Sequence, residues 1–169
     1  FNPSCLLRKG STAKKVPMDS LQTFRRKITG YEISEYKSGP KFINGDTLVA
    51  KITPCLENGK TAYVDILEDK EVAFGSSEFI VLRPKKGNNE LFLYYLSISP
   101  AFRKRAISCM EGTSGRKRVN ENSLKIQELP IPDLTIQKRI AAVLSSLDSK
   151  IELNNRINTE LEAMAKTLY

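Results

Sequence analysis

A chain of 169 residues, of which 40% are hydrophobic, can bury one ordinary core, which predicts a single domain with room for an appendage. The absence of histidine excludes Ser-His-Asp and Cys-His catalysis and every zinc site that uses histidine. No apolar run approaches the roughly 18 residues of a membrane-spanning helix, so we expect no insertion into a membrane.

The three cysteines, Cys5, Cys55 and Cys109, are widely spaced and form no CxxC pair. This usage is typical of reduced thiols and predicts a cytoplasmic protein without a disulfide framework. The chain opens at Phe1 with neither an initiator methionine nor a charged-then-apolar leader. We therefore expect a fragment of a longer protein or a processed form, and no secretion.

The formal net charge of +8 is concentrated in the front of the chain. Residues 1–134 hold 22 lysines and arginines against 15 aspartates and glutamates, whereas residues 135–169 hold 5 against 4. A basic folded module commonly faces a polyanion, because each phosphate contact releases condensed counterions and adds affinity. The alternative is that the charge serves solubility alone.

Alternating side chains predict strands in the first half of the chain. Pro17 lies in a short extended stretch, so we expect an edge strand over residues 16–18. Residues 47–53 and 61–66 alternate β-branched and apolar side chains on either side of a polar loop, which predicts a β-hairpin. Two further strands are predicted around a Gly-Ser-Ser turn, over residues 72–74 and 78–83. Together they predict one curved, mostly antiparallel sheet.

Two short helices are predicted after these strands. An asparagine, either Asn88 or Asn89, can cap a helix over residues 90–97. A second helix over residues 101–110 follows a proline that breaks the first. The outward cations at residues 103–105 are typical of a solvated face, with phosphate contact as the alternative.

Residues 112–118, Gly-Thr-Ser-Gly-Arg-Lys-Arg, form the densest polar and basic loop of the chain. The glycines allow consecutive backbone N–H groups to turn toward an anion, while the hydroxyls and cations supply contacts to phosphates or base edges. The loop is not a Walker loop, because its second glycine comes too early and no hydroxyl follows Lys117. We interpret it as a nucleic-acid contact, with an ordinary basic turn as the alternative.

A long helix is predicted at the end of the chain. Residues 129–132, Leu-Pro-Ile-Pro, form a stiff connector, and Thr135 is the predicted N-cap. At about 1.5 Å per residue the helix spans about 50 Å, which is more than a domain of this size needs. Steps of four and three residues define an apolar seam for pairing with another helix. The seam positions are Ile140, Leu144, Leu147, Ile151, Asn154, Asn158, Leu161, Ala165 and Leu168.

The seam has two further features. Val143, Ile157 and Met164 lie beside it and widen the apolar face, which favours packing in a bundle. The two central asparagines of the seam, Asn154 and Asn158, are expected to destabilise any pairing of the helices in the wrong register. The alternative is that they are simply exposed at a bend of the helix. On the exposed face, Glu152 and Arg156 are predicted to form an ion pair one turn apart.

These elements predict an α+β fold: a curved sheet domain with a few short helices over residues 1–133, then one long helix over residues 134–169. No pair of carboxylates, metal-ligating cluster or glycine-rich cofactor loop stands out, so we expect no catalytic site, no cofactor and no metal. A basic domain joined by a stiff connector to a pairing helix is the plan of an adaptor.

Four stretches, in their order and spacing, identify this plan further. They are Gly45-Asp46-Thr47-Leu48-Val49 continuing through Gly59-Lys60, Phe79 to Pro84, Gly112 to Val119, and Leu129 to Pro132 followed by a helix that contains Asp148-Ser149-Lys150-Ile151-Glu152-Leu153-Asn154. In these stretches, which cover nearly the whole chain, it resembles one half of the DNA-specificity subunit of type I restriction-modification enzymes.

The resemblance implies a role and partners. A full subunit of this family carries two such units, each a target recognition domain with a helix, and the two helices pair as an antiparallel coiled coil that acts as a ruler between half-sites. This chain would then be a fragment of a longer subunit or a half-subunit that pairs with a second copy. The implied partners are double-stranded DNA, methyltransferase (M) subunits and the restriction/translocase (R) subunit. Methylation and cleavage of DNA would both be carried out by those partners, so the chain itself is not expected to be an enzyme.

Contacts to DNA should come from cations, amides and hydroxyls on loops and strand ends. The predicted DNA-binding residues are Lys51, Thr53, Asn58, Lys60, Ser76, Ser77, Thr113, Ser114, Arg116, Lys117 and Arg118. Two other interpretations stay open. One is a generic basic nucleic-acid-binding module, and the other is a coiled-coil assembly module whose basic domain contacts another protein.

Overall fold

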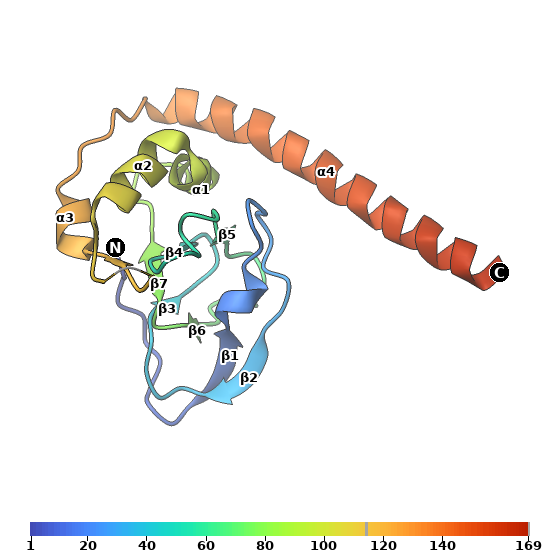
Figure 1. Ribbon diagram of the computed structural model, residues 1–169, viewed down its shortest axis with the longest axis horizontal. Coiled ribbons are helices and arrows are strands. Elements are labelled where there is room, and N and C mark those ends of the chain that lie inside the picture. Colours follow the sequence, from blue (N-terminus) through green and yellow to red (C-terminus); the bar gives the residue numbers. More distant parts are fainter. Residues whose placement is uncertain (114, 169) are drawn as a thin grey trace.

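The computed structural model describes residues 1–113 and 115–168, the last of these by its backbone alone. Ser114, one of the predicted DNA-binding residues, and the side chain of the seam residue Leu168 lie outside this description. The fold is α+β, as predicted, with strands in the first half of the chain and helices in the second (Figure 1).

The strands form two sheets and a small hairpin instead of the single sheet that we predicted. The four-stranded sheet has the order β2-β1-β6-β3, and the three-stranded sheet has the order β5-β4-β7. The strands are β1 (Thr12–Val16), β2 (Glu32–Glu35), β3 (Lys41–Phe42), β4 (Thr47–Ala50), β5 (Thr61–Tyr63), β6 (Ala73–Gly75), β7 (Phe79–Leu82), β8 (Met110–Glu111) and β9 (Arg118–Val119). All pairings are antiparallel except that of β1 with β6.

Two details of the strand prediction are wrong. The strand predicted at the edge of the sheet, β1, lies between β2 and β6, because it ends at Val16 and Pro17 falls outside the hydrogen-bonded ladder. The strands predicted around the Gly-Ser-Ser turn belong to different sheets, since Ser76 donates its backbone N–H to Val16 at the end of β1. The predicted hairpin of β4 and β5 is confirmed.

The core consists of two layers on either side of the three-stranded sheet. Successive side chains of a strand point to opposite faces, and every residue of β4 and β7 is buried. Leu48 and Val81 pack toward the four-stranded sheet, in a cluster with Val16 and Phe42. Their neighbours Val49 and Ile80 pack on the other side with Phe102, below the short helices. Figure 1 shows the same order of layers.

The two predicted short helices are confirmed as α1 (Glu90–Ile98) and α2 (Pro100–Ser108), although the second ends two residues earlier than predicted. The helix α3 (Glu121–Lys125) and the 3-10 turn η1 (Met18–Ser20) were not predicted. Of the two candidate caps, Asn89 caps α1, because its side chain accepts a hydrogen bond from the N–H of Phe92 at 2.8 Å. Pro100 is the first residue of α2, where its missing N–H costs no hydrogen bond.

The predicted long helix is confirmed as a single element, α4 (Leu134–Leu168), whose distal half projects away from the domain (Figure 1). Its predicted cap is wrong: the helix begins one residue before Thr135, and the Asp133 carboxylate accepts a hydrogen bond from the N–H of Ile136 at 3.0 Å. The first half of α4 packs against α1. Among the described residues, no helix is long and apolar enough to cross a membrane.

Candidate nucleic-acid interface

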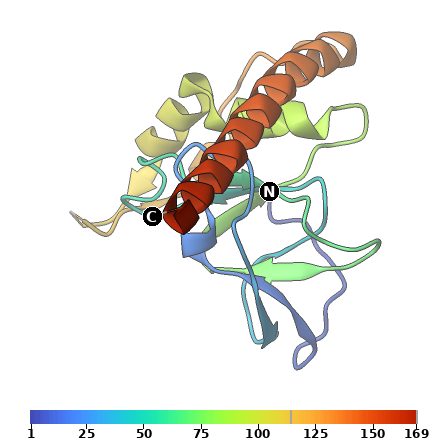
Figure 2. The same cartoon turned by 90° about the vertical axis from the view of Figure 1, so that its right-hand side faces the viewer.

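Backbone hydrogen bonds bring three of the predicted DNA-binding stretches to one side of the domain. Beyond the end of β4, Lys51 accepts a bond from Val119 at 2.8 Å and donates one to Glu78 at 2.9 Å. The N–H of Thr53 donates to the carbonyl of Lys117 at 3.0 Å. The predicted residues at 51, 53, 76, 77, 113 and 116–118 therefore share one surface, from which the hairpin of β8 and β9 protrudes (Figure 2).

Carboxylates hold two of the predicted cations on this surface. Glu78 accepts from the Arg118 guanidinium through both of its oxygens, at 2.9 to 3.0 Å, and this bonding raises the pKa of Arg118. Glu121 accepts from the Lys51 ammonium at 3.1 Å. The two cations are thus oriented before any ligand arrives, and a phosphate would have to share them with these carboxylates.

Arg116 and Lys117 differ from these two cations. Both side chains are exposed at the tip of the hairpin, and within the described chain no ion pair holds either of them. Thr113 is exposed beside them. Exposed cations on a protruding hairpin can reach a polyanion without first breaking an internal contact.

The remaining predicted residues divide between outward and inward positions. Asn58 and Ser77 are exposed, whereas the Lys60 ammonium turns inward to the carbonyl of Met18 at 3.3 Å. The Thr53 hydroxyl donates to Glu57 at 3.4 Å. The Ser76 hydroxyl accepts from the N–H of Glu78 at 3.2 Å and so shapes the turn before β7.

The loop of residues 22–27, which carried no motif in the sequence, borders this surface. Its Phe24 has a φ of +50°, is 49% exposed, and donates its N–H to the carbonyl of Gly59 at 3.2 Å. The Arg103 guanidinium lies 4.7 Å from the centre of the Phe24 ring, while its Nη2 donates to the carbonyl of Glu57 at 2.6 Å. The only sequence signal for this arrangement was the run of cations at residues 103–105.

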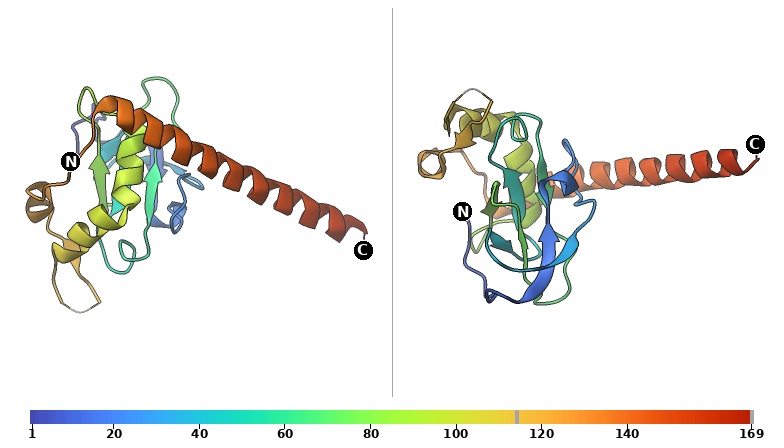
Figure 3. Two further views of the ribbon diagram at one scale, coloured as in Figure 1. Left: turned by 90° about the horizontal axis from the view of Figure 1, so that it is seen from above. Right: turned by 60° about the horizontal axis from the view of Figure 1, so that its bottom comes forward.

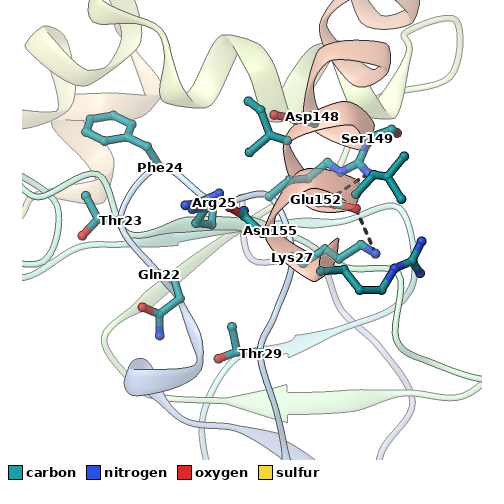
Figure 4. A pocket seen from close by; sticks show the side chains of 14 residues that line it. Gln22, Thr23, Phe24, Arg25, Lys27, Thr29, Asp148, Ser149, Glu152 and Asn155 are labelled. Atoms are coloured by element: carbon teal, nitrogen blue, oxygen red, sulfur yellow. Dashed lines mark hydrogen bonds and ion pairs between the residues drawn. The ribbon is translucent and has the colours of Figure 1, made fainter. Parts of the chain in front are cut away.

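A groove of about 800 Å³ separates this loop from α4. Its lining includes Phe24, Arg25, Lys27, Ser149, Glu152 and Asn155, and Figure 4 shows the side chains of the loop facing those of the helix. On the helix side, Glu152 bonds Lys27 at 3.0 Å and Arg26 at 3.4 Å. The predicted pair of Glu152 with Arg156 is replaced by these contacts, because the domain lies within reach of the carboxylate.

The seam of α4 lies beside the face that packs on the domain. Gln137 and Ala141 are buried, and Asp148 and Glu152 bond to the domain. The seam residues Ile140, Leu147 and Ile151 each precede one of these positions, which places them about 100° around the helix. In this single chain Leu144 is half-buried and the other seam residues with a described side chain are exposed, namely Ile140, Leu147, Ile151, Asn154, Asn158, Leu161 and Ala165. The domain therefore leaves the seam open for another helix.

An α+β domain with an exposed basic hairpin, carried on a long helix with an open apolar seam, has the features of a binding module. The sequence model of the family described as type I restriction modification DNA specificity domain matches residues 8–163. The chain belongs to this family.

Curated relatives agree with this assignment. The chain is 34% identical over 154 residues to the type I restriction enzyme EcoAI specificity subunit of Escherichia coli, a match that covers 88% of this chain and 26% of that protein. It is 34% identical over 139 residues to the EcoEI specificity subunit of the same species, covering 78% of this chain and 23% of the relative. The chain thus spans about a quarter of the length of these relatives.

Solved structures share the fold. A crystal structure of the HsdS subunit from Thermoanaerobacter tengcongensis aligns with a TM-score of 0.69 at 22% identity, over 95% of this chain and 41% of that one. A chain from a structural study of assembly and conformational transition in a type I R-M system aligns with a TM-score of 0.69 at 23% identity, over 90% and 40% of the two chains.

Proposed function

We propose that this chain is a DNA-recognition unit of a type I restriction-modification complex and that it reads one half of a bipartite target. The observation that carries the proposal is the family match over residues 8–163, which includes the whole basic surface. The net charge of residues 1–134 and the exposed cations of the hairpin supply the attraction that double-stranded DNA requires.

In this proposal residues 1–133 are the target recognition domain and residues 134–169 are a spacer and pairing helix. The seam of α4 pairs in an antiparallel coiled coil with a second copy or with the other half of a longer subunit. The described residues of α4 beyond Glu152 are exposed, and a helix of about 15 residues without a partner is marginally stable in water. This exposure supports a partner helix along the distal half.

The chemistry in this proposal belongs to partner subunits. Methyltransferase (M) subunits dock on α4 and the DNA, and a restriction/translocase (R) subunit joins them for cleavage. The chain itself contributes recognition and distance, without a catalytic site of its own. The names of the relatives, which are specificity subunits, support this division of labour and a cytoplasmic location with the DNA.

The DNA contacts are proposed at the residues predicted from the sequence. Arg116 and Lys117 are the strongest candidates because they are exposed at the tip of the protruding hairpin. Arg118 and Lys51 would contact DNA from orientations set by Glu78 and Glu121. Phe24 and Arg103 extend the same surface toward α4.

A gel-shift titration of the full-length protein with and without its methyltransferase partner tests this function. We expect sequence-specific binding of duplex DNA that arises only in the assembled complex. Binding of any duplex with equal affinity, with or without the methyltransferase, would instead identify a generic nucleic-acid-binding module. Failure to bind DNA in both cases would identify an assembly module.

A further inference from the structure

The polar contacts between α4 and the domain lie on one face of the helix. The Tyr95 hydroxyl of α1 donates to the Asp148 carboxylate at 2.7 Å. One turn later Glu152 accepts from Lys27 through one oxygen, at 3.0 Å, and from Arg26 through the other, at 3.4 Å. We call these five side chains the clamp.

The clamp is shielded from solvent on the side of Tyr95 and Arg26 and open at Lys27. Tyr95 is 7% exposed and the Arg26 side chain is 12% exposed, whereas the side chains of Glu152 and Lys27 are 29% and 56% exposed. Burial lowers the pKa of the Arg26 guanidinium, but Glu152, Tyr95 and Asp148 together more than offset this, so the pKa is raised overall. Ion pairs that are partly shielded from water are stiffer and less sensitive to salt than those on the surface.

A second attachment point lies at the start of α4. Gln137 is 2% exposed, and its amide makes three hydrogen bonds: it accepts from the N–H of Asn89 at 2.9 Å and donates to Asn88 at 3.0 Å and to the carbonyl of Pro132 at 2.9 Å. Between Gln137 and Glu152 the helix rises about 22 Å. Two polar attachments at this separation fix the direction of the helix axis relative to the domain.

Small changes in this direction have large effects at the far end of the helix. Between Glu152 and Leu168 the helix rises about 24 Å. A tilt of about 8° about the clamp therefore moves the tip by about 3.4 Å, the rise of one base pair along a strand of DNA. A connection that tolerated such a tilt could not distinguish neighbouring half-site separations.

The clamp also connects α4 to the predicted DNA-facing surface. Arg26 and Lys27 belong to the loop of residues 22–27, and the backbone of that loop pairs with the loop that ends at Lys60 through a bridge at Thr23 and the bond from Phe24 to Gly59. The carbonyl of Arg26 also accepts from Tyr63 of β5 at 2.9 Å. The helix is thus tied to the recognition surface through backbone hydrogen bonds.

We propose that Asp148 and Glu152 are positioning residues that fix the angle between the recognition domain and α4, and thereby the number of base pairs between the two half-sites. This proposal rests on the proposed function of the chain. It assigns to the clamp a role in the choice of target, separate from the reading of bases by the hairpin.

The test uses the full-length protein assembled with its methyltransferase and sequencing that detects methylated bases in genomic DNA. In the wild type we expect one bipartite motif in which the two half-sites are always separated by the same number of base pairs, which we call the gap length. In the double variant Asp148→Asn, Glu152→Gln we expect the same half-site sequences, with discrimination against gaps one base pair longer or shorter reduced by about tenfold, as for the loss of a hydrogen bond to a charged group. Tyr95→Phe should reduce the discrimination in the same direction by a smaller factor.

The matched control is Glu160→Gln, which neutralises an exposed carboxylate on the distal half of α4 and should keep the single gap. The charge exchange Arg26→Glu, Glu152→Arg should restore discrimination that Glu152→Arg alone loses. The proposal is overturned if the double variant and Tyr95→Phe keep the gap discrimination of the wild type, even where the melting temperature falls, because the clamp would then be merely structural. A wild-type complex that methylates no bipartite motif would refute the proposed function itself.

Discussion

At the scale of single residues, the cations of the basic surface differ in what holds them. Glu78 and Glu121 hold Arg118 and Lys51 in place, whereas Arg116 and Lys117 are exposed at the tip of the hairpin. The sequence marked all four as equivalent members of a basic pattern. It could not distinguish them, because the carboxylates come from positions 40 and 70 residues away along the chain.

The variant Arg116→Glu, Lys117→Glu should weaken specific binding of DNA by the assembled complex. Each lost phosphate contact removes one released counterion, so the slope of the logarithm of affinity against the logarithm of salt concentration should fall in magnitude by about 2. Fluorescence anisotropy at several salt concentrations measures both quantities.

The matched control for this variant is Lys70→Glu, which also reverses the charge of an exposed lysine. Lys70 belongs to the loop between β5 and β6, on the opposite side of the domain from the hairpin (Figure 3, left). Specific binding that survives the reversal at Arg116 and Lys117 as well as it survives the control would remove the hairpin from the DNA interface.

At the scale of elements, α4 was the most predictable part of the fold, because a four-three apolar spacing sustained over nearly 30 residues is typical of a long pairing helix and of little else. The face that packs on the domain was not predicted. Its residues Gln137, Asp148 and Glu152 are polar, and polar helical residues are usually solvated. Their role follows from partners before and on α1, at Pro132 and on the loop of residues 22–27, which only the tertiary structure reveals.

Substituting aspartate at Leu147 and Leu161 should prevent pairing of α4. Both side chains are about half exposed in the single chain, and burying a carboxylate in an apolar seam costs several kcal/mol. Sedimentation equilibrium at several concentrations should detect a paired wild type, either as a dimer or as a folded two-unit subunit, and loss of that state in the variant.

The control for the pairing variant is Leu153→Asp, which introduces the same charge at an exposed leucine two residues after the seam position Ile151, about 200° around the helix. The seam would be excluded as the pairing surface if the two variants left the same fraction of paired protein.

Gln137→Leu should destabilise the junction of α4 with the domain. Leucine preserves the volume but leaves the N–H of Asn89 without its acceptor and the carbonyl of Pro132 without its donor. Leaving such groups buried and unpaired costs about 1–3 kcal/mol in the free energy of unfolding. Urea denaturation measures the change, and Gln127→Leu, at an exposed glutamine between α3 and the connector, should leave the unfolding free energy within about 0.5 kcal/mol of the wild type.

At the scale of the whole molecule, the order of elements was predicted but the partition of the strands was not. The positions of β4, β5, β6 and β7 followed from local alternation. Their division between two sheets depends on contacts between residues that are far apart in the sequence. One of these is the parallel pairing of β1 with β6, in which Lys15 lies opposite Phe74. Neither periodicity nor turn residues carry information about such long-range pairings.

That residues 1–133 read a half-site is tested most directly by exchanging them, in the full-length protein, for the aligned segment of the EcoAI specificity subunit while α4 is retained. Methylated-base sequencing of the assembled complex should then detect a new half-site sequence at an unchanged gap length, since the recognition surface is replaced and the helix is not. Methylation of the original half-site sequence after the exchange would contradict a role of this domain in reading DNA.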